Sequence, residues 1–474
     1  MTATTAPKLT APPEPAPAPQ SVPELVAHLR STYASGRTRP LEWRREQLAR
    51  LRLMLVEREA DFLAALATDL GKPATEAWAT DVGFVISEID YIRRHLRAWM
   101  RPERVWTPMV ARPGSARLVR EPYGVALVIA PWNYPVQLLL SPMVGALAAG
   151  NCVVGKPSEL APATSSVLAR TVPKYLDNDA VAVVEGGVPE TTELLAQPFD
   201  YIFYTGNSRV ARVVMEAAAK RLTPVTLELG GKSPVIVDDD ADLEVAARRV
   251  AWGKFLNAGQ TCIAPDYALV ARGAEERFVE HIRRAVFDFY GAEPKDSPDY
   301  GRIVNDQHTQ RLAKLLDGGT ATVGGTVDRG ARYVAPTVLQ EVKPDAAALQ
   351  EEIFGPILPV IPVDSVDAAV DYVNEREKPL ALYLFSRSRS KRQEVLERTS
   401  SGGAAVNATM FQVSVPGLPF GGIGPSGMGA YHGKASFETF SHAKPVFRKA
   451  TKPDPALAYP PYTSRKDRLI RRFL

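Results

Sequence analysis

From Tyr123 onward, short runs rich in valine and isoleucine alternate with stretches that have the residue spacing of helices. The apolar runs are Val125–Ala130, Cys152–Gly155, Val181–Glu185, Tyr201–Tyr204 and Val225–Leu227. The helical stretches between them lie near Gln137–Ala149, Ala163–Val172 and Ser208–Arg221. Parallel strands need long crossover connections, which are usually helices, so this alternation predicts a parallel sheet with helices on its faces. The fold class that we expect is α/β.

The rest of the chain predicts a second domain and a helical N-terminal region. Another series of apolar runs begins at Val235–Val237 and continues past Phe354 to Leu382–Phe385. Between Glu24 and about Arg101, apolar residues recur every three or four positions, as on one face of an amphipathic helix. We therefore expect N-terminal helices followed by two sheet-based domains.

The composition is that of a globular protein rather than of a disordered chain. Hydrophobic residues make up 45% and charged residues 23% of the 474 residues, which are ordinary values. The 57 lysines and arginines exceed the 53 acidic residues by only four, and no run of five like charges occurs. We therefore expect no nucleic-acid partner.

The cysteines, histidines and apolar stretches exclude several other classes. Cys152 and Cys262 are the only cysteines, which excludes a disulfide framework and favours a reducing compartment. The six histidines show no ligand spacing with either cysteine, so we expect no metal site. The start of the chain lacks the apolar core of a secretory signal. The most apolar stretch, Val125 to Val154, is interrupted by three prolines and predicts no integral membrane segment. We expect a cytoplasmic protein.

Two glycine-containing segments are candidates for nucleotide binding. The segment Gly422 to Gly427 fits the pattern G-x-G-x-x-G, but it follows a loop and contains Pro425. That pattern indicates dinucleotide binding only between a strand and a helix, so we do not expect it to bind a cofactor. The turn from Thr205 to Ser208 follows an apolar run and opens a helical stretch. Amides at a helix N-terminus can hold a phosphate, although most such turns bind nothing.

Three polar residues lie where each side chain can face a cleft. Cys262 has polar and glycine-containing neighbours in NAGQTCIAPD, whereas Cys152 lies in the apolar run NCVVG. Glu228 ends an apolar run, and Asn133 follows another in PWNYP. Taken alone, each has a more ordinary interpretation: a buried apolar cysteine, a salt bridge from Glu228 to Lys232, and a turn-forming asparagine.

Together these segments resemble the aldehyde dehydrogenase superfamily from about residue 24 to the C-terminus. The matching segments are PWNYP, KPSEL, YTGNS, LELGGKSP, GQTCIAPDY and EEIFGP. The stretch LPFGGIGPSGMGAYHGKASFETFSH and the tail AYPPYTSRK are similar to the class-3 branch, whose members are NAD(P)-dependent dimers that act on medium-chain and aromatic aldehydes.

The resemblance implies a chemical role for each of the three polar residues. A thiolate at Cys262 would capture the aldehyde as a thiohemiacetal. The Asn133 amide and the Cys262 backbone N–H would stabilise the oxyanion. Glu228 would act as the general base that hydrolyses the thioester. The resemblance also implies a tunnel lined by Tyr134, Met410 and Phe411, whose bulk favours aromatic or medium-chain substrates.

The resemblance further implies which residues bind the cofactor. These are Trp132, Lys156, Glu159, Gly206, Asn207, Glu352 and Phe354. Lys156 and Glu159 match the positions that bind the adenosine ribose, and a carboxylate at Glu159 favours NAD over NADP because it would repel a 2′-phosphate. Two positions depart from the family: Ala211 stands where a second glycine is usual, and Gln412 where class-3 members often carry histidine.

The resemblance implies a domain plan and a homodimer. It comprises a tail at 1–22, a Rossmann-like NAD(P)-binding domain at 23–104 and 122–228, a catalytic α/β domain at 229–428, a small β oligomerisation element at 105–121 and 429–450, and a C-terminal extension at 451–474. The segments that match the two-fold interface of the family lie near Arg104–Arg120 and Phe437–Arg448.

Other functions remain open at this point. A semialdehyde dehydrogenase, or an acylating enzyme that passes the thioester to coenzyme A, would share the motifs, although acylating relatives typically lack the glutamate matched by Glu228. A catalytically silent structural protein on this fold would be marked by loss of Cys262 or Glu228, and both are present. A cysteine hydrolase would need a histidine that accompanies Cys262 in a recognisable motif, and none does.

Overall fold

The computed structural model describes residues 21–454 and 456–473. The expected tail at 1–22 lies outside these residues apart from its last two, and the first helix, α1, begins at Val22. The N-terminal region is helical, as predicted. Its elements are α1 (Val22–Ala34), α2 (Leu41–Glu57), α3 (Glu59–Leu70), α4 (Ala74–Ala77), a π-helical turn (Trp78–Val82) and α5 (Gly83–Trp99).

The first predicted sheet is confirmed, with helices between its strands. The strands are β3 (Val125–Ile129), β4 (Cys152–Lys156), β5 (Val181–Val183), β6 (Tyr201–Thr205), β7 (Val225–Glu228) and β17 (Gly427–Met428), in the order β17-β7-β6-β3-β4-β5. All neighbours are parallel except β17, which pairs antiparallel with β7. The helices are α6 (Gln137–Ala149), α7 (Pro162–Tyr175), α8 (Val188–Leu195) and α9 (Ser208–Ala219). Every residue of α6 is buried, so this helix lies inside the domain.

The second sheet has seven strands in the order β10-β13-β14-β9-β8-β15-β16. These are β8 (Pro234–Val237), β9 (Tyr267–Ala271), β10 (Thr320–Val323), β13 (Thr337–Gln340), β14 (Ile357–Val363), β15 (Ala381–Phe385) and β16 (Gly403–Val406), with a separate hairpin of β11 (Val327–Asp328) and β12 (Tyr333–Val334). Its helices are α10 (Leu243–Phe255), α11 (Glu275–Tyr290), α12 (Asp306–Leu315), α13 (Ala347–Gln350), α14 (Val366–Asn374) and α15 (Arg389–Arg398). Separate apolar clusters cover the two faces of this sheet.

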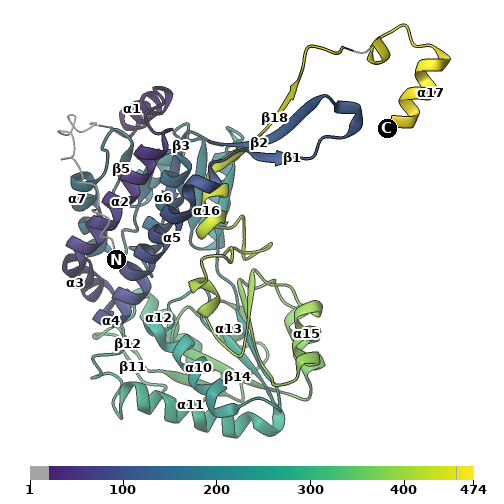
Figure 1. Cartoon of the computed structure of the whole chain (residues 1–474). Helices are drawn as coiled ribbons and strands as arrows, with labels where there is room; N and C mark the ends of the chain where they lie inside the picture. Colours follow the sequence, from purple (N-terminus) through teal and green to yellow (C-terminus); the bar gives the residue numbers. More distant parts are fainter. Residues whose placement is uncertain (1–20, 455, 474) are drawn as a thin grey trace, which may run out of the picture.

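A third, small sheet projects from the body of the molecule (Figure 1). It contains β1 (Glu103–Val105), β2 (Gly114–Pro122) and β18 (Ser441–Lys449), all antiparallel, in the order β1-β2-β18. The chain then continues to α17 (Ser464–Phe473), which lies beyond the tip of this sheet in the view shown (Figure 1). Among the described helices, none has the length and apolar character needed to cross a membrane.

The expected bridging segment at 429–450 divides between two parts of the structure. Only β18 joins the small sheet, whereas α16 (Gly433–Thr439) packs against α5 and α6 of the first domain. Gly145 of α6 permits this contact, because a Cβ atom there would lie 2.8 Å from Cβ of Ser436. The side-chain amide of Asn151 also donates to the carbonyl of Phe440 at 2.9 Å. Residues from near the C-terminus therefore pack as part of the first domain.

Candidate active site

The polar residues singled out in the sequence follow strands of the first sheet or precede strands of the second. Asn133 follows β3, Lys156 ends β4 and Glu228 ends β7, so they lie at the carboxyl edge of the first sheet. Cys262 lies five residues before β9, at the amino edge of the second sheet. Ligands of open parallel sheets bind outside the carboxyl ends of the strands, and here the second domain closes that edge.

Cys262 lines an apolar cavity, whereas Cys152 is wholly buried in β4. Burial raises the pKa of Cys262 to about 12, and the nearby carboxyl groups of Glu352 and Glu228 add to this effect. The backbone N–H groups of Cys262 and Ile263 point towards the sulfur and act in the opposite direction. The thiol is therefore protonated at neutral pH unless a further group lowers its pKa.

Glu228 is only 2% exposed and lines the same cavity as Cys262. Neither of its carboxylate oxygens has a hydrogen-bond partner, and burial raises its pKa well above the usual range. The salt bridge to Lys232 considered from the sequence is absent, because Lys232 instead pairs with Asp266. Burial without a partner favours the protonated form of this carboxyl group, so it can accept a proton only after it has ionised.

Asn133 connects the loop after β3 to the segment that carries Cys262. Its side-chain Nδ2 donates to the carbonyl of Gln260 at 3.0 Å, and Asn257 Nδ2 donates to the Asn133 carbonyl at 2.8 Å. Next to it, the hydroxyls of Tyr134 and Thr261 share a hydrogen bond of 2.6 Å. One N–H of the Asn133 amide is used by Gln260, and the second has no partner among the described residues. Asn133 is 2% exposed and does not itself line the cavity that Cys262 lines.

The backbone before Cys262 adopts an unusual conformation. Asn257, Ala258 and Gly259 all have positive φ, between 51° and 73°. Glycine is required at 259, because a Cβ atom there would lie 2.3 Å from the carbonyl oxygen of Gly355. The carboxylate of Glu76 accepts the Asn257 backbone N–H at 2.9 Å. Strained backbone of this kind persists only where its surroundings hold it, and it is concentrated at functional sites.

The cavity has a volume of about 210 Å³ and is lined mainly by apolar and aromatic side chains. Its lining includes all three residues predicted for the substrate tunnel, Tyr134, Met410 and Phe411. The sequence did not single out the other aromatic residues of the lining, which are Phe84, Trp252, Phe420 and Tyr431. No lysine or arginine is present in this lining as far as the described residues show.

Two pairs of predicted cofactor residues lie at the carboxyl ends of β4 and β6, the two strands that flank β3. Lys156 Nζ donates to the Glu159 carboxylate at 3.0 Å, directly after β4. Gly206 and Asn207 follow β6, and Asn207 Oδ1 accepts the Val210 backbone N–H and thereby caps α9. A Cβ atom at Gly206 would lie 2.2 Å from the hydroxyl oxygen of Tyr204, so only glycine fits this turn.

The two departures from the family pattern have structural explanations. The methyl group of Ala211 is 2% exposed and belongs to the apolar cluster of the first domain, so it faces the core. Gln412 donates to the hydroxyl of Tyr383 at 3.3 Å, and that hydroxyl donates to the carbonyl of Ile263 at 2.6 Å. Through Tyr383, Gln412 therefore helps to fix the backbone of Ile263, the residue after Cys262.

The remaining predicted cofactor residues meet between the two domains. The rings of Trp132 and Phe354 lie 5.4 Å apart, edge to face, and His308 of α12 contacts the other side of Trp132 at 5.2 Å. Burial and neighbouring Asp266 raise the pKa of Glu352 to about 8. Arg311 holds this segment by donating to the carbonyl of Ile353 at 2.5 Å. The aromatic wall, the glycine turn and the Lys156–Glu159 pair fit a dinucleotide.

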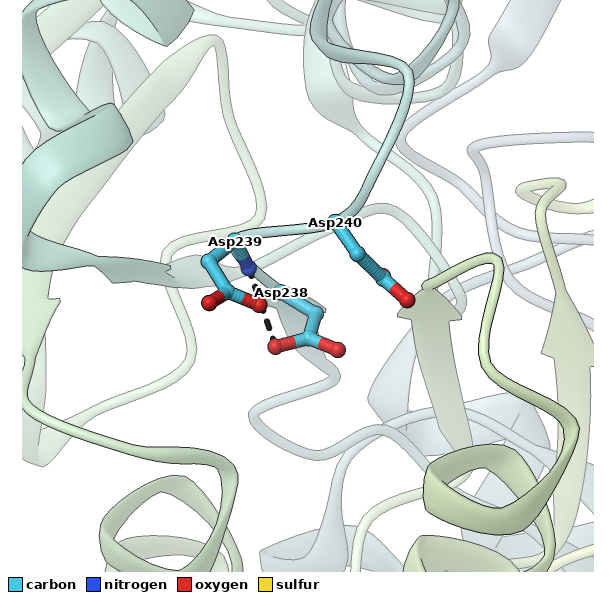
Figure 2. Close-up of side chains that lie close together, drawn as sticks. All are labelled: Asp238, Asp239 and Asp240. Carbon is cyan, nitrogen blue, oxygen red and sulfur yellow. Dashed lines mark hydrogen bonds between the residues drawn. The ribbon is translucent and has the colours of Figure 1, made fainter.

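A cluster of three carboxylates lies at the opposite edge of the second sheet. Asp238, Asp239 and Asp240 follow β8 and gather closely (Figure 2). Lys391 donates to Asp238 and Asp239 at 2.9 and 3.0 Å, and Asp240 accepts two backbone N–H groups that precede α15. These bonds attach α15 to β8, which accounts for the cluster without a ligand.

Comparisons with known proteins agree with this geometry. The pattern that describes the aldehyde dehydrogenase family matches residues 15–446. The chain is 50% identical over 451 residues to aldehyde dehydrogenase family 3 member A2 of Mus musculus, covering 95% of this chain and 93% of that protein. It is 47% identical over 447 residues to a dimeric NADP-preferring aldehyde dehydrogenase of Canis lupus familiaris, covering 94% of this chain and 99% of that protein.

Solved structures show the same fold. A substrate-bound aldehyde dehydrogenase (AldH) of Staphylococcus aureus superimposes with a TM-score of 0.94 at 43% identity, covering 96% of this chain and 100% of that one. An indole-3-acetaldehyde dehydrogenase in complex with NAD⁺ superimposes with a TM-score of 0.82 at 26% identity, covering 90% of this chain and 88% of that one.

The raised pKa of Cys262 predicts how its alkylation depends on pH in the cofactor-free protein. Because only the thiolate reacts, and burial raises this pKa to about 12, the rate with iodoacetamide should increase about tenfold per pH unit from pH 7 to 9 without a plateau. Intact-mass measurement follows the reaction. Cys262→Ala should abolish labelling, since Cys152 is wholly buried. A plateau below pH 9 would show that the free enzyme already stabilises the thiolate.

Proposed function

The chain belongs to the aldehyde dehydrogenase family and carries out NAD(P)-dependent aldehyde oxidation, and we propose that it does so through a thioester on Cys262. The observation that carries this mechanism is that one apolar cavity is lined by both Cys262 and the buried, unpartnered carboxyl group of Glu228. The other thiol, Cys152, is wholly buried in β4.

The first half of the reaction needs a nucleophile and donors for an oxyanion. Cys262 Sγ loses its proton to solvent and forms a bond to the aldehyde carbon, whose C=O double bond becomes a single bond. The oxygen then carries negative charge, which the free N–H of Asn133 and the Cys262 backbone N–H stabilise. Lys156, Glu159 and Gly206, together with Glu352 and the Trp132–Phe354 pair, would hold NAD(P), which would supply the hydride acceptor that this oxidation requires.

The second half of the reaction releases the acid. Glu228 takes a proton from water, whose oxygen bonds to the acyl carbon, and the C–S bond then breaks so that the thiol recovers its proton. One aldehyde and one water thus give one carboxylic acid, one hydride, which carries two electrons, and one proton, which is released to solvent. A base with a raised pKa holds an abstracted proton well, but Glu228 must first be ionised, so this step favours alkaline pH.

We propose medium-chain aliphatic or aromatic aldehydes as substrates. The lining of the cavity is largely apolar, with four aromatic residues besides Tyr134 and Phe411. A semialdehyde carries a carboxylate, and its recognition would require a cation that the described lining lacks. The cavity therefore favours uncharged aldehydes over the semialdehydes considered from the sequence.

We also propose a cytoplasmic homodimer. Both cysteines are free thiols, as expected in a reducing compartment. The small β sheet and the connection between β1 and β2 expose a group of large apolar side chains: Val105 and Phe447 in the strands, and Trp106, Met109 and Val110 in the connection. An exposed apolar group of this kind on a projecting sheet is typical of a protein interface, and a relative at 47% identity is named as dimeric.

The role of Glu228 is tested by Glu228→Gln, which keeps the shape of the side chain and removes the base. Thiohemiacetal formation does not need Glu228, so the variant should release NADH in a burst near one per active site and then turn over very slowly. Intact-mass spectrometry should find the acyl group on Cys262. Cys262→Ala should give neither burst nor adduct. Turnover of Glu228→Gln at the wild-type rate would show that another group is the base.

The preference between NAD and NADP is tested at Glu159. We expect NAD to be preferred, because the Glu159 side chain is 48% exposed and its charge repels a 2′-phosphate, although Lys156 offsets part of that charge. Glu159→Gln should therefore raise the ratio of kcat/KM for NADP to that for NAD several-fold. Glu216→Gln, at an exposed carboxylate on α9, is the control. A wild-type ratio that clearly favours NADP would contradict the expectation.

The dimer is tested by sedimentation at several protein concentrations. Trp106 directly follows β1 of the small sheet and is 75% exposed, so Trp106→Ser should weaken association and shift the dimer towards monomer on dilution. Phe287→Ser is the matched control, since Phe287 is 60% exposed on α11 in the second domain. A wild-type monomer at every concentration would refute the homodimer.

A further inference from the structure

A buried ion pair lies beneath the loop that carries Asn133. Lys72 follows the end of α3 at Gly71, and Asp81 lies in the π-helical turn before α5. Lys72 Nζ and Asp81 Oδ2 are 2.8 Å apart, and both side chains are 0% exposed. Neither residue lines the cavity, and neither belongs to a motif that the sequence singled out.

Both members of the pair hold the segment between β3 and α6. Lys72 Nζ donates to the carbonyl oxygen of Asn133 at 3.2 Å and lies 4.0 Å from the ring centroid of Tyr134. Asp81 Oδ1 accepts the backbone N–H groups of Val136 and Gln137, both at 3.2 Å, where α6 begins. The pair therefore contacts the backbone on both sides of Pro135.

Stability alone does not account for such a pair. Removing two charges from water costs more than their attraction commonly returns, and apolar replacements of buried pairs are often neutral or stabilising. What the pair does provide is a fixed position for a loop that has no strand or helix of its own. The Asn133 amide must lie within a fraction of an ångström of its productive position to stabilise an oxyanion.

We propose that Lys72 and Asp81 are positioning residues for aldehyde oxidation, which hold the Asn133 amide in place by fixing the backbone of residues 133–137. This inference rests on the proposed role of Asn133 as an oxyanion donor. Lys72 and Asp81 act through Asn133 and do not contact the aldehyde. Their loss should therefore lower kcat while leaving cofactor binding unchanged.

The test is a double-mutant cycle between Lys72→Met and Asn133→Ala. Asn133→Ala should lower kcat/KM about 10²- to 10³-fold, as for other oxyanion donors. In the wild-type background, Lys72→Met should lower kcat/KM about tenfold to a hundredfold. When Asn133 is already alanine, Lys72→Met should lower kcat/KM less than about twofold, because the side chain that Lys72 positions is gone. Equal losses in the two backgrounds would overturn the proposal.

Two further variants separate positioning from folding. Lys72→Met leaves Asp81 without its partner and should lower Tm, whereas Lys72→Met with Asp81→Asn removes both charges and retains an oxygen for the two N–H groups. This double variant should recover Tm but not kcat/KM. Recovery of both would show a purely structural role. If Lys72→Met does not fold, Asp81→Asn takes its place in the cycle with the same expected outcomes.

The matched control is Arg44→Met at the other end of α6. Arg44 is also a buried cation, and its Nη1 donates to the carbonyl of Ala148 at 3.1 Å. This variant should lower Tm but leave kcat/KM within about twofold of wild type. A loss as large as that of Lys72→Met would overturn the proposal. If Asn133→Ala itself retains full activity, Asn133 is not an oxyanion donor. That single variant therefore distinguishes failure of the proposed function from failure of the positioning proposal.

Discussion

Parallel strands all end at one edge of their sheet, and the arrangement of this protein follows from bringing two such edges together. The carboxyl edge of the first sheet supplies Asn133, Lys156 and Glu228, and the amino edge of the second supplies Cys262. The bonds from Asn133 to Gln260 and from Tyr134 to Thr261 join the two sets of loops. Asn133, about 130 positions before Cys262 in the chain, is thereby bonded to the segment that carries the cysteine.

Closing this cleft excludes water, and exclusion of water determines the electrostatics of the site. It raises the pKa of Cys262 to about 12 and that of Glu228 well above its usual range. Burial thus favours the neutral form of both groups. A neutral thiol and a neutral carboxyl group are compatible with an apolar cavity. The apolar lining that admits an uncharged aldehyde is also what keeps these groups protonated.

Much of this arrangement was predictable from the sequence, and the exceptions share a physical reason. Alternating apolar runs predicted both sheets, whereas the roles expected of Cys262, Glu228 and Asn133 came from the resemblance of their segments to the aldehyde dehydrogenase superfamily. Lys72 and Asp81 escaped prediction because they lie in a helical region where a lysine and an aspartate are ordinary surface residues. Their burial depends on packing against α6, a contact between segments about sixty positions apart. The salt bridge from Glu228 to Lys232 that was considered from the sequence is absent for the same reason. Lys232 pairs with Asp266, which approaches it only in the folded chain.

The site also contains strained backbone, which contacts from other parts of the molecule must stabilise. Four of the nine described non-glycine residues with positive φ belong to it: Asn257, Ala258, Phe354 and Met410. Each such residue costs about 1 to 2 kcal/mol. Glu76 from the first domain fixes Asn257, and Asp266 accepts the backbone N–H of Ile353 at 2.9 Å beside Phe354. The strained segments are thus held from both domains, so the geometry around Cys262 requires the two domains to be packed together. The buried Lys72–Asp81 pair extends the same principle to the loop of Asn133, where buried charges take the place of a regular strand or helix.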